Sequence, residues 1–166
     1  ELEITETIQY LIDNNFKVSA HFLENSSSWI DTGKMEDILE ANRLVLEVLT
    51  ERSEGVVDEQ SEICGRVVLE PGSEVINSVI RGPAIIGERT RIVNSYVGPF
   101  TSINHDCLVS DSEIEHSVVL ENSRILGIRY RIENSLIGRN VEVARSPMKP
   151  RAYKLVLGDY SKVGLL

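Results

Sequence analysis

Two of the three histidines lie where they could take part in proton transfer. His105 is followed directly by Asp106, and a histidine that acts as a general base has to be held in one orientation, which a neighbouring carboxylate can provide. His116 occupies a position in a repeat described below and is expected to make turn contacts there. Because His21 lies outside that repeat, His105 is the candidate base.

Asp31 is the second candidate for chemistry. It lies just before a helix that the sequence predicts over Lys34–Thr50, where apolar residues recur at helical spacing. Asp is common as a cap immediately before a helix, and the residues alone favour that role for Asp31. A lone carboxylate is also a ligand for magnesium, which binds one or two carboxylates together with substrate phosphates.

The elements that carry these residues follow an unusual rhythm, a ladder of aliphatic residues spaced five or six apart. Neither an amphipathic helix nor an alternating strand keeps this period, whereas each side of a triangular coil uses about six residues. The ladder predicts that the following residues point into the core of a solenoid: Ile63, Leu69, Val75, Ile80, Ile86, Ile92, Val97, Ile103, Leu108, Ile114, Leu120, Leu126, Ile132, Ile137 and Val143.

A second repeat has a step of 17 or 18 residues, which is three sides or one turn of the coil. Its members are Asn77-Ser78, Asn94-Ser95, Asp111-Ser112, His116-Ser117 and Asn134-Ser135. Asn and Asp suit corners because they tolerate left-handed backbone. Small residues four places after ladder positions are expected inside the bends, and four glycines are expected to supply positive φ, namely Gly72, Gly87, Gly98 and Gly138.

These patterns resemble the left-handed parallel β-helix of hexapeptide-repeat proteins. The fold class we expect is therefore mainly β, a left-handed parallel β-helix preceded by the C-terminal remnant of an α/β domain. A β-sandwich with short strands is the alternative, and it accounts less well for the regular spacing.

Composition limits the function classes. The net charge is −9 at pH 7, which argues against general nucleic-acid binding. We see neither an 18-residue apolar run nor a signal peptide, and the two cysteines make a disulfide framework improbable, so a cytoplasmic location is expected. Ala144–Leu166 carries five basic residues against one acidic, which is typical of a solvated or subunit-contacting tail.

The first 54 residues have another texture. They predict a helix over Glu6–Asn14, a strand over Phe16–Leu23 and the helix over Lys34–Thr50. They contain no glycine-rich phosphate loop, and they read as the end of an α/β domain whose beginning lies upstream. The expected domains are residues 1–54, the β-helix over 55–144 and a basic tail over 145–166.

Several segments together resemble one enzyme family, the sugar-1-phosphate nucleotidyltransferases. They are Glu1-Leu2-Glu3-Ile4-Thr5, Trp29-Ile30-Asp31-Thr32-Gly33, Glu40-Ala41-Asn42, Ile114-Glu115-His116-Ser117-Val118-Val119-Leu120 and Leu157-Gly158-Asp159-Tyr160-Ser161. Within that family the chain resembles the C-terminal part of long-form glucose-1-phosphate thymidylyltransferases, in which a β-helix follows the catalytic domain. The Trp-x-Asp-Thr-Gly motif is fairly specific to nucleotidyltransferases, whereas the ladder alone is not.

The resemblance implies transfer of a nucleotidyl group from dTTP to glucose-1-phosphate, giving dTDP-glucose and pyrophosphate. It makes Asp31 one carboxylate ligand of a Mg²⁺ ion and places Glu1 and Glu3 near the sugar nucleotide. The implied partners of the full-length enzyme are a nucleoside triphosphate, a sugar-1-phosphate and further copies of the chain, with no nucleic acid and no membrane. UTP in place of dTTP would leave these residues unchanged.

Two other functions are open for this piece of chain. Some hexapeptide-repeat proteins are acyltransferases that use a histidine as general base, and His105 would serve an acyltransferase acting on an amino-sugar phosphate. The other possibility is that the β-helix carries no chemistry and is an oligomerisation or regulatory module. For the chain alone, the second is the interpretation we favour, because no long loop interrupts the ladder to hold an acyl carrier.

Overall fold

The structure is a computed structural model that describes residues 4–22, 29–145, 155 and 161–164. The chain divides into two compact units, Glu1–Asp31 and Thr32–Leu166. Within the described residues, none of the helices is long and apolar enough to cross a membrane.

The first unit contains helix α1 (Ile4–Asp13), and none of the residues of this helix is buried. Its end is fixed by Asn15, whose φ of 58° is left-handed, and by a bond from the Phe16 amide to the Leu11 carbonyl. The helix predicted over Glu6–Asn14 is therefore confirmed, starting two residues earlier. Its apolar side chains are open to solvent, with Ile4 78% and Ile8 42% exposed.

The strand predicted over Phe16–Leu23 is wrong for the residues that can be judged. Residues 16–22 have no regular structure, and Leu23 lies outside the described residues. The alternating pattern is present, but a strand is held by hydrogen bonds to a neighbouring strand. The described part of this unit contains no second strand for it to pair with.

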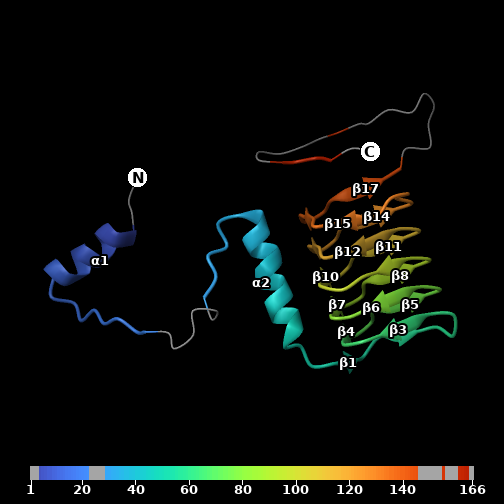
Figure 1. The fold of residues 1–166 in the computed structure, drawn as a ribbon, viewed down its shortest axis with the longest axis horizontal. Helices are drawn as coiled ribbons and strands as arrows, with labels where there is room; N and C mark the ends of the chain where they lie inside the picture. The colour runs from blue at the N-terminus through green and yellow to red at the C-terminus, as the bar shows by residue number, and fades with distance from the viewer. Residues whose placement is uncertain (1–3, 23–28, 146–154, 156–160, 165–166) are drawn as a thin grey trace. The chain divides into compact units, whose positions relative to one another are not determined.

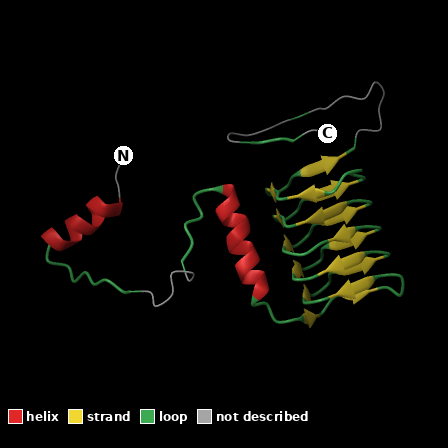
Figure 2. Cartoon of the chain, viewed as in Figure 1, coloured by secondary structure: helices red, strands yellow, loops and turns green. Residues whose placement is uncertain are grey.

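The second unit begins with helix α2 (Met35–Glu47), confirming the long helix predicted from the sequence. Three sheets of short strands follow (Figures 1 and 2). The first sheet holds β1 (Arg52–Ser53), β4 (Val67–Leu69), β7 (Ala84–Ile86), β10 (Thr101–Ile103), β13 (Val118–Val119) and β16 (Leu136–Ile137). The second holds β2 (Val56–Val57), β5 (Glu74–Ile76), β8 (Arg91–Val93), β11 (Leu108–Ser110), β14 (Arg124–Leu126) and β17 (Glu142–Ala144). The third holds β3 (Glu62–Cys64), β6 (Val79–Arg81), β9 (Tyr96–Val97), β12 (Glu113–Glu115) and β15 (Ile132–Glu133).

Every strand pairs in parallel with the strand three places along the chain. In the first sheet, for example, Leu69 lies opposite Ile86, and Ile86 lies opposite Ile103. Three strands therefore make one turn, and the chain winds through about five turns of a parallel β-solenoid. The mainly β fold expected from the ladder is confirmed.

The core is a set of stacked aliphatic columns, one from each sheet. Ile80, Ile86, Ile92, Val97 and Ile114 are completely buried. Stacking places like side chains at the strand spacing of about 4.8 Å, so each one packs against its equivalent in the turns before and after. The small residues expected at the bends are also inside, namely Ser73, Thr90, Thr101, Cys107 and Ser112.

Three members of the predicted ladder are wrong by one residue. Leu108, Leu120 and Leu126 are only partly buried, whereas their neighbours Val109, Val119 and Ile125 are at most 1% exposed. The reason is the strand period of two, counted from the small residue at each bend. Cys107, Ser117 and Ser123 point inward, so the inward aliphatic follows two places later.

The corners are built as the second repeat predicted. Asn77, Asn94, Asp111, His116 and Asn134 all have left-handed backbone, with φ between 43° and 49°. The side chains at one corner form hydrogen bonds from turn to turn, since Nδ2 of Asn77 donates to Oδ1 of Asn94 over 2.8 Å. The Asn94 amide nitrogen donates in turn to Asp111 Oδ1 over 3.2 Å.

The expectation about glycine holds for Gly72, whose φ is 73°, but is wrong for Gly87, Gly98 and Gly138. At Gly87 the requirement is closeness instead. A Cβ there would lie 2.5 Å from the carbonyl carbon of Asn104 in the next turn, nearer than real Cβ atoms come to other atoms. The prediction that this position requires glycine is sound, but the reason is the short distance between turns and not a positive φ.

Candidate functional site

Asp31 lies four residues before α2 in a segment that is open to solvent. Trp29 is 67% exposed, and Asp31 itself is exposed. The N-cap position of α2 belongs to Lys34, which has extended backbone and makes no side-chain capping bond. Asp31 is therefore not the N-cap residue of this helix.

The donor chemistry of Asp31 fits one position in a magnesium site. A carboxylate oxygen is a ligand that Mg²⁺ prefers, and this ion usually keeps water and substrate phosphates as its other ligands. Among residues 4–22, 29–145, 155 and 161–164, no group of three or more His, Cys, Asp or Glu side chains could hold a metal ion. Asp31 would thus supply a single carboxylate. Glu1 and Glu3 lie outside the described residues.

The candidate base His105 is oriented by its neighbour, as the sequence predicted. Its Nδ1 lies 2.8 Å from Oδ2 of Asp106, and its backbone amide donates to Oδ1 of Asn104 over 2.8 Å. With Nδ1–H donating to the carboxylate, Nε2 is the nitrogen left to accept a proton. The side chain is 43% exposed at the corner between the first and second sheets.

Asp106 is shared with a stronger partner. Arg89, one turn earlier, donates from Nε and Nη2 to both oxygens of Asp106 over 2.7 and 2.8 Å. The Arg89 guanidinium, with a smaller contribution from His105, holds the pKa of Asp106 well below its usual range. Both oxygens of the Asp106 carboxylate thus take part in a bidentate ion pair with Arg89, and this indicates a structural role for the cluster.

His116 is a corner residue. Its Nδ1 lies 2.6 Å from Oδ1 of Asn134, and its ring meets the Phe100 ring edge-on with centroids 6.1 Å apart. Its Nε2 is buried and has no hydrogen-bond partner in the part of the chain that the structure describes. The predicted turn contacts are confirmed, and the burial of Nε2 removes His116 as a base for a substrate in solution.

Asn42 has a structural role that sequence reasoning missed. From the middle of α2 it donates to the Phe100 carbonyl over 2.9 Å and accepts from the Ser102 hydroxyl over 2.6 Å. On the same face, Leu39 and Leu46 are 4% and 2% exposed. An Asn inside a helix is unfavourable by propensity, and that was the available signal that it bonds elsewhere.

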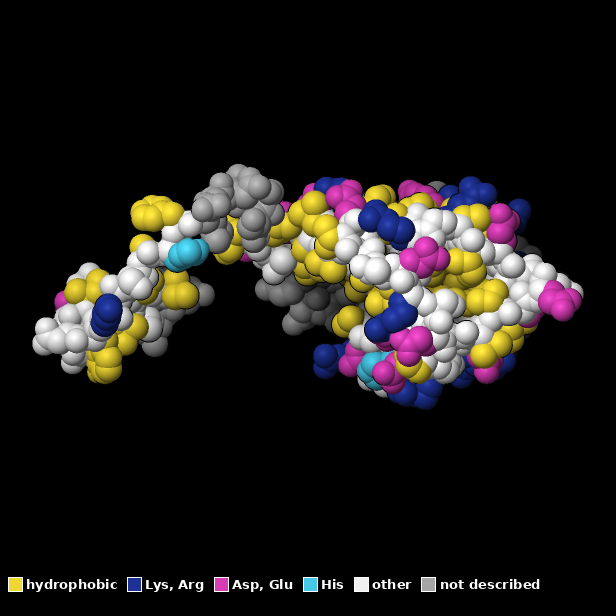
Figure 3. All heavy atoms as spheres, turned by 90° about the horizontal axis from the view of Figure 1, so that it is seen from below, with side chains coloured by type: hydrophobic (Ala, Val, Ile, Leu, Met, Phe, Trp, Pro, Cys, Tyr) yellow, Lys and Arg dark blue, Asp and Glu magenta, His cyan; other side chains and the backbone are white. Residues whose placement is uncertain are grey.

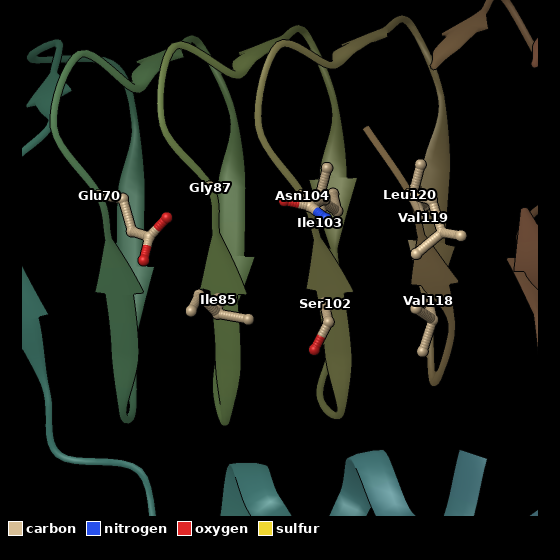
Figure 4. Close-up of a pocket in the computed structure, with 9 residues that line it drawn as sticks. All are labelled: Glu70, Ile85, Gly87, Ser102, Ile103, Asn104, Val118, Val119 and Leu120. Carbon is tan, nitrogen blue, oxygen red and sulfur yellow. The ribbon is translucent and has the colours of Figure 1, made fainter. Parts of the chain in front are cut away.

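A shallow groove runs along the outer face of the first sheet beside α2 (Figure 4). In the figure Ile85, Ser102 and Val118 lie in one row on successive turns, with Glu70 and Asn104 at the edge of the groove. Glu70 is the sole charged side chain in the lining. The groove offers little that could orient a polar substrate, so it carries no catalytic assignment.

The fold defines a class of protein, the hexapeptide-repeat type of parallel β-solenoid, and comparison with known proteins narrows it. No family model matches the chain. A glucose-1-phosphate thymidylyltransferase from Streptomyces griseus is 53% identical over 162 residues, which are 98% of this chain and 45% of that protein. The enzyme of the same name from Streptomyces antibioticus is 52% identical over 163 residues, with the same two shares.

The chain is thus similar to the C-terminal part of glucose-1-phosphate thymidylyltransferases, and the resemblance stated from the sequence is confirmed. It spans slightly less than half the length of these relatives. A more distant relative is the bifunctional protein GlmU of Methanocaldococcus jannaschii, 35% identical over 143 residues, which are 84% of this chain and 34% of that protein.

Proposed function

We propose that this chain is the C-terminal part of a nucleotidyltransferase that transfers a nucleotidyl group from dTTP to glucose-1-phosphate, giving dTDP-glucose and pyrophosphate. The observation that carries the proposal is the 53% identity to a thymidylyltransferase over 98% of the chain. Similarity of this extent covers the segment around Asp31 as well as the solenoid. UTP in place of dTTP is the alternative within the same reaction class.

In this proposal residues 1–54 are the end of the α/β catalytic domain. Support comes from the apolar side chains of the first unit, which its own described residues leave open to solvent. Ile4, Tyr10 and Phe22 are 78%, 64% and 87% exposed. Such side chains are normally buried, and a preceding domain would bury them.

Asp31 would hold Mg²⁺ in the assembled active site. The ion neutralises phosphate charge when bound, in a reaction that depends on positioning and charge neutralisation more than on covalent help. Asp31 contributes one carboxylate, on an exposed segment that a substrate could reach. Glu1 and Glu3 are proposed to lie near the sugar nucleotide, on the strength of the sequence motif alone.

The solenoid is proposed to be a left-handed β-helix that serves as an oligomerisation or regulatory module of a cytoplasmic enzyme. The left hand rests on the resemblance to hexapeptide-repeat proteins alone, because the general rule for crossovers between parallel strands would favour the right hand. Open end turns and flat faces are surfaces that such modules bury on association. The basic tail over 145–166 would cap the last turn or contact a subunit.

The test is Asp31→Asn in the full-length protein, assayed with dTTP, glucose-1-phosphate and limiting magnesium by pyrophosphate release. Asn preserves the shape of the side chain, but it lacks the charge that holds the metal. We expect most activity to be lost, with partial recovery at high magnesium. Activity near that of the unsubstituted enzyme at limiting magnesium would remove Asp31 from the metal site.

Acyl transfer is the second candidate function, because one relative is named a bifunctional protein and because His105 is oriented by a carboxylate at 2.8 Å. The competing claim of Arg89 on Asp106 weighs against it. Acetyl-CoA with an amino-sugar phosphate is the assay, with thiol release as the readout. We expect none above background. Turnover that disappears in His105→Ala would establish the acyltransferase instead.

A further inference from the structure

Helix α2 has three faces, and one of them is apolar and uncovered. The first face, which includes Leu39, Asn42 and Leu46, is buried on the first sheet. The second is charged, with Arg43 bonded to both Glu40 and Glu47. The third carries aliphatic residues at helical spacing, and its members are Ile38, Ala41, Val45 and Val48. We call these four residues the outer stripe.

Three of the four residues of the outer stripe are exposed in the unit that contains them, and Ala41 is half-buried. Ile38 is 37%, Val45 62% and Val48 80% exposed. Scattered apolar residues on a surface need no explanation, but four in a row over three helical turns form a docking face of the kind that helices present to grooves. On the face seen in Figure 3, one group of hydrophobic side chains lies on the α2 side of the solenoid, and others lie among charges of both signs over the remainder.

Helix formation does not explain the stripe either. Val and Ile are β-branched and are less favourable in helices than the Leu, Glu or Lys that exposed positions could hold. Packing on the solenoid does not use them, since the buried face of α2 lies elsewhere. The remaining explanation for apolar residues at these positions is burial against another surface.

We propose that the outer stripe is the docking surface for the part of the full-length protein that precedes this chain. This rests on the proposed function, because the thymidylyltransferase relatives have more than half of their length outside the matched region. Helix α2 comes directly before the strands of the solenoid in the sequence. A second copy of the chain fits less well, since stable dimers bury about 800 Å² on each partner. A domain in the same chain is held near the helix by the covalent linkage, so it needs a smaller buried area to stay docked.

The experiment measures maleimide labelling of Val45→Cys and Val48→Cys, each in a Cys64→Ser background, with Arg124→Cys on the second sheet as control. In the 166-residue chain we expect all three to label at similar rates. In the full-length protein we expect the two stripe positions to slow by about tenfold or more, and the control to stay unchanged. Both stripe side chains are exposed, so the substitutions leave the melting temperature of the chain unchanged.

Equal labelling rates in the two proteins would overturn the docking. Slowing that appears in the 166-residue chain itself and grows with its concentration would also overturn it, and would assign the stripe to a second copy. The pyrophosphate assay on the unlabelled full-length variants separates this inference from the proposed function. Protection without thymidylyl transfer supports the docking and overturns the function. Transfer without protection does the reverse.

Discussion

The central turns and the last turn of the solenoid use the same residue types and differ in how well they bury them. In the central turns Ile80, Ile92 and Ile114 are completely buried. In the last turn Ile137 is 9% exposed, and four further aliphatics are only partly buried, namely Ile128, Ile132, Val141 and Val143. Aliphatic content is therefore not the cause of the difference.

The cause is the number of neighbouring turns. Within the described residues, strands β15, β16 and β17 each lie at the edge of their sheet and pair on one side, whereas β9, β10 and β11 pair on both. In a stacked repeat every turn contacts the adjacent ones alone, so stability is a sum of neighbour terms. The comparison teaches that burial here is a property of position in the stack.

The largest contrast is expected from a charge placed in each region. Ile86→Asp buries an unpaired carboxylate where the side chain is 0% exposed, and should cost about 4 kcal/mol or more of unfolding free energy. Ile132→Asp, where the side chain is partly exposed, should cost far less because water reaches the carboxylate. Thermal melts of both variants measure this. A fall of only a degree or two for Ile86→Asp would mean that the register of the turns is wrong.

A methyl group gives a smaller contrast. Gly87→Ala places a Cβ 2.5 Å from the Asn104 backbone and should cost about 1–3 kcal/mol, because backbone must move. Gly138→Ala, near the end of the stack, has its nearest atom at 3.8 Å and should change stability by a few tenths of a kcal/mol. Urea unfolding with a common m-value is the measurement. Equal losses would show that the last turn is packed as tightly as the central ones.

The bonds that Asn42 makes to the solenoid test how much α2 stabilises the turns that it contacts. Asn42→Ala removes the bonds to the Phe100 carbonyl and the Ser102 hydroxyl and should cost about 1–2 kcal/mol. Ser102→Ala loses one of them, so the double variant should show a coupling of about 0.5–1 kcal/mol. Additive losses in this double-mutant cycle would mean that the two side chains do not interact in solution.

The smallest effect is expected on the melting temperature at acidic pH. The pKa of Asp106 is lowered in the folded state by Arg89, so its contribution is fully present above the unfolded pKa of about 3.9. It is lost as pH falls below that value. Asp106→Asn should therefore lose less melting temperature between pH 6 and pH 3 than the unsubstituted chain. Glu142→Gln in the last turn removes the same charge and is the control. Parallel melting curves for Asp106→Asn and the unsubstituted chain would contradict this ion pair.

The solenoid could be predicted because its signals are local and repeated. The 17-residue step placed the Asn and Asp corners correctly, since only a few residue types accept left-handed backbone without strain. The ladder failed at Leu108, Leu120 and Leu126, where two aliphatics are adjacent and a period of five or six cannot choose between them. Counting by two from Cys107, Ser117 and Ser123 would have chosen correctly.

The site was harder to predict for two physical reasons. The role of Asn42 depends on hydrogen bonds to residues 58 and 60 places away, which no local pattern reveals. The pairing of Arg89 with Asp106 likewise follows from stacking one turn on the next. His105 beside Asp106 was predictable because the two are adjacent, and the metal role of Asp31, which comes from a sequence motif, stays a prediction.

The direction of the backbone hydrogen bonds has a mechanical consequence. Bonds between turns run along the stack, so tension applied along that axis would load one row of bonds at a time and peel the turns apart in sequence. Helix α2 changes this at one end. It is tied to Arg66 through the Glu47 carbonyl and to Phe100 and Ser102 through Asn42, and these residues flank or lie in β4 and β10. The helix therefore links the early turns to one another, so that under load the solenoid would open first from its far end.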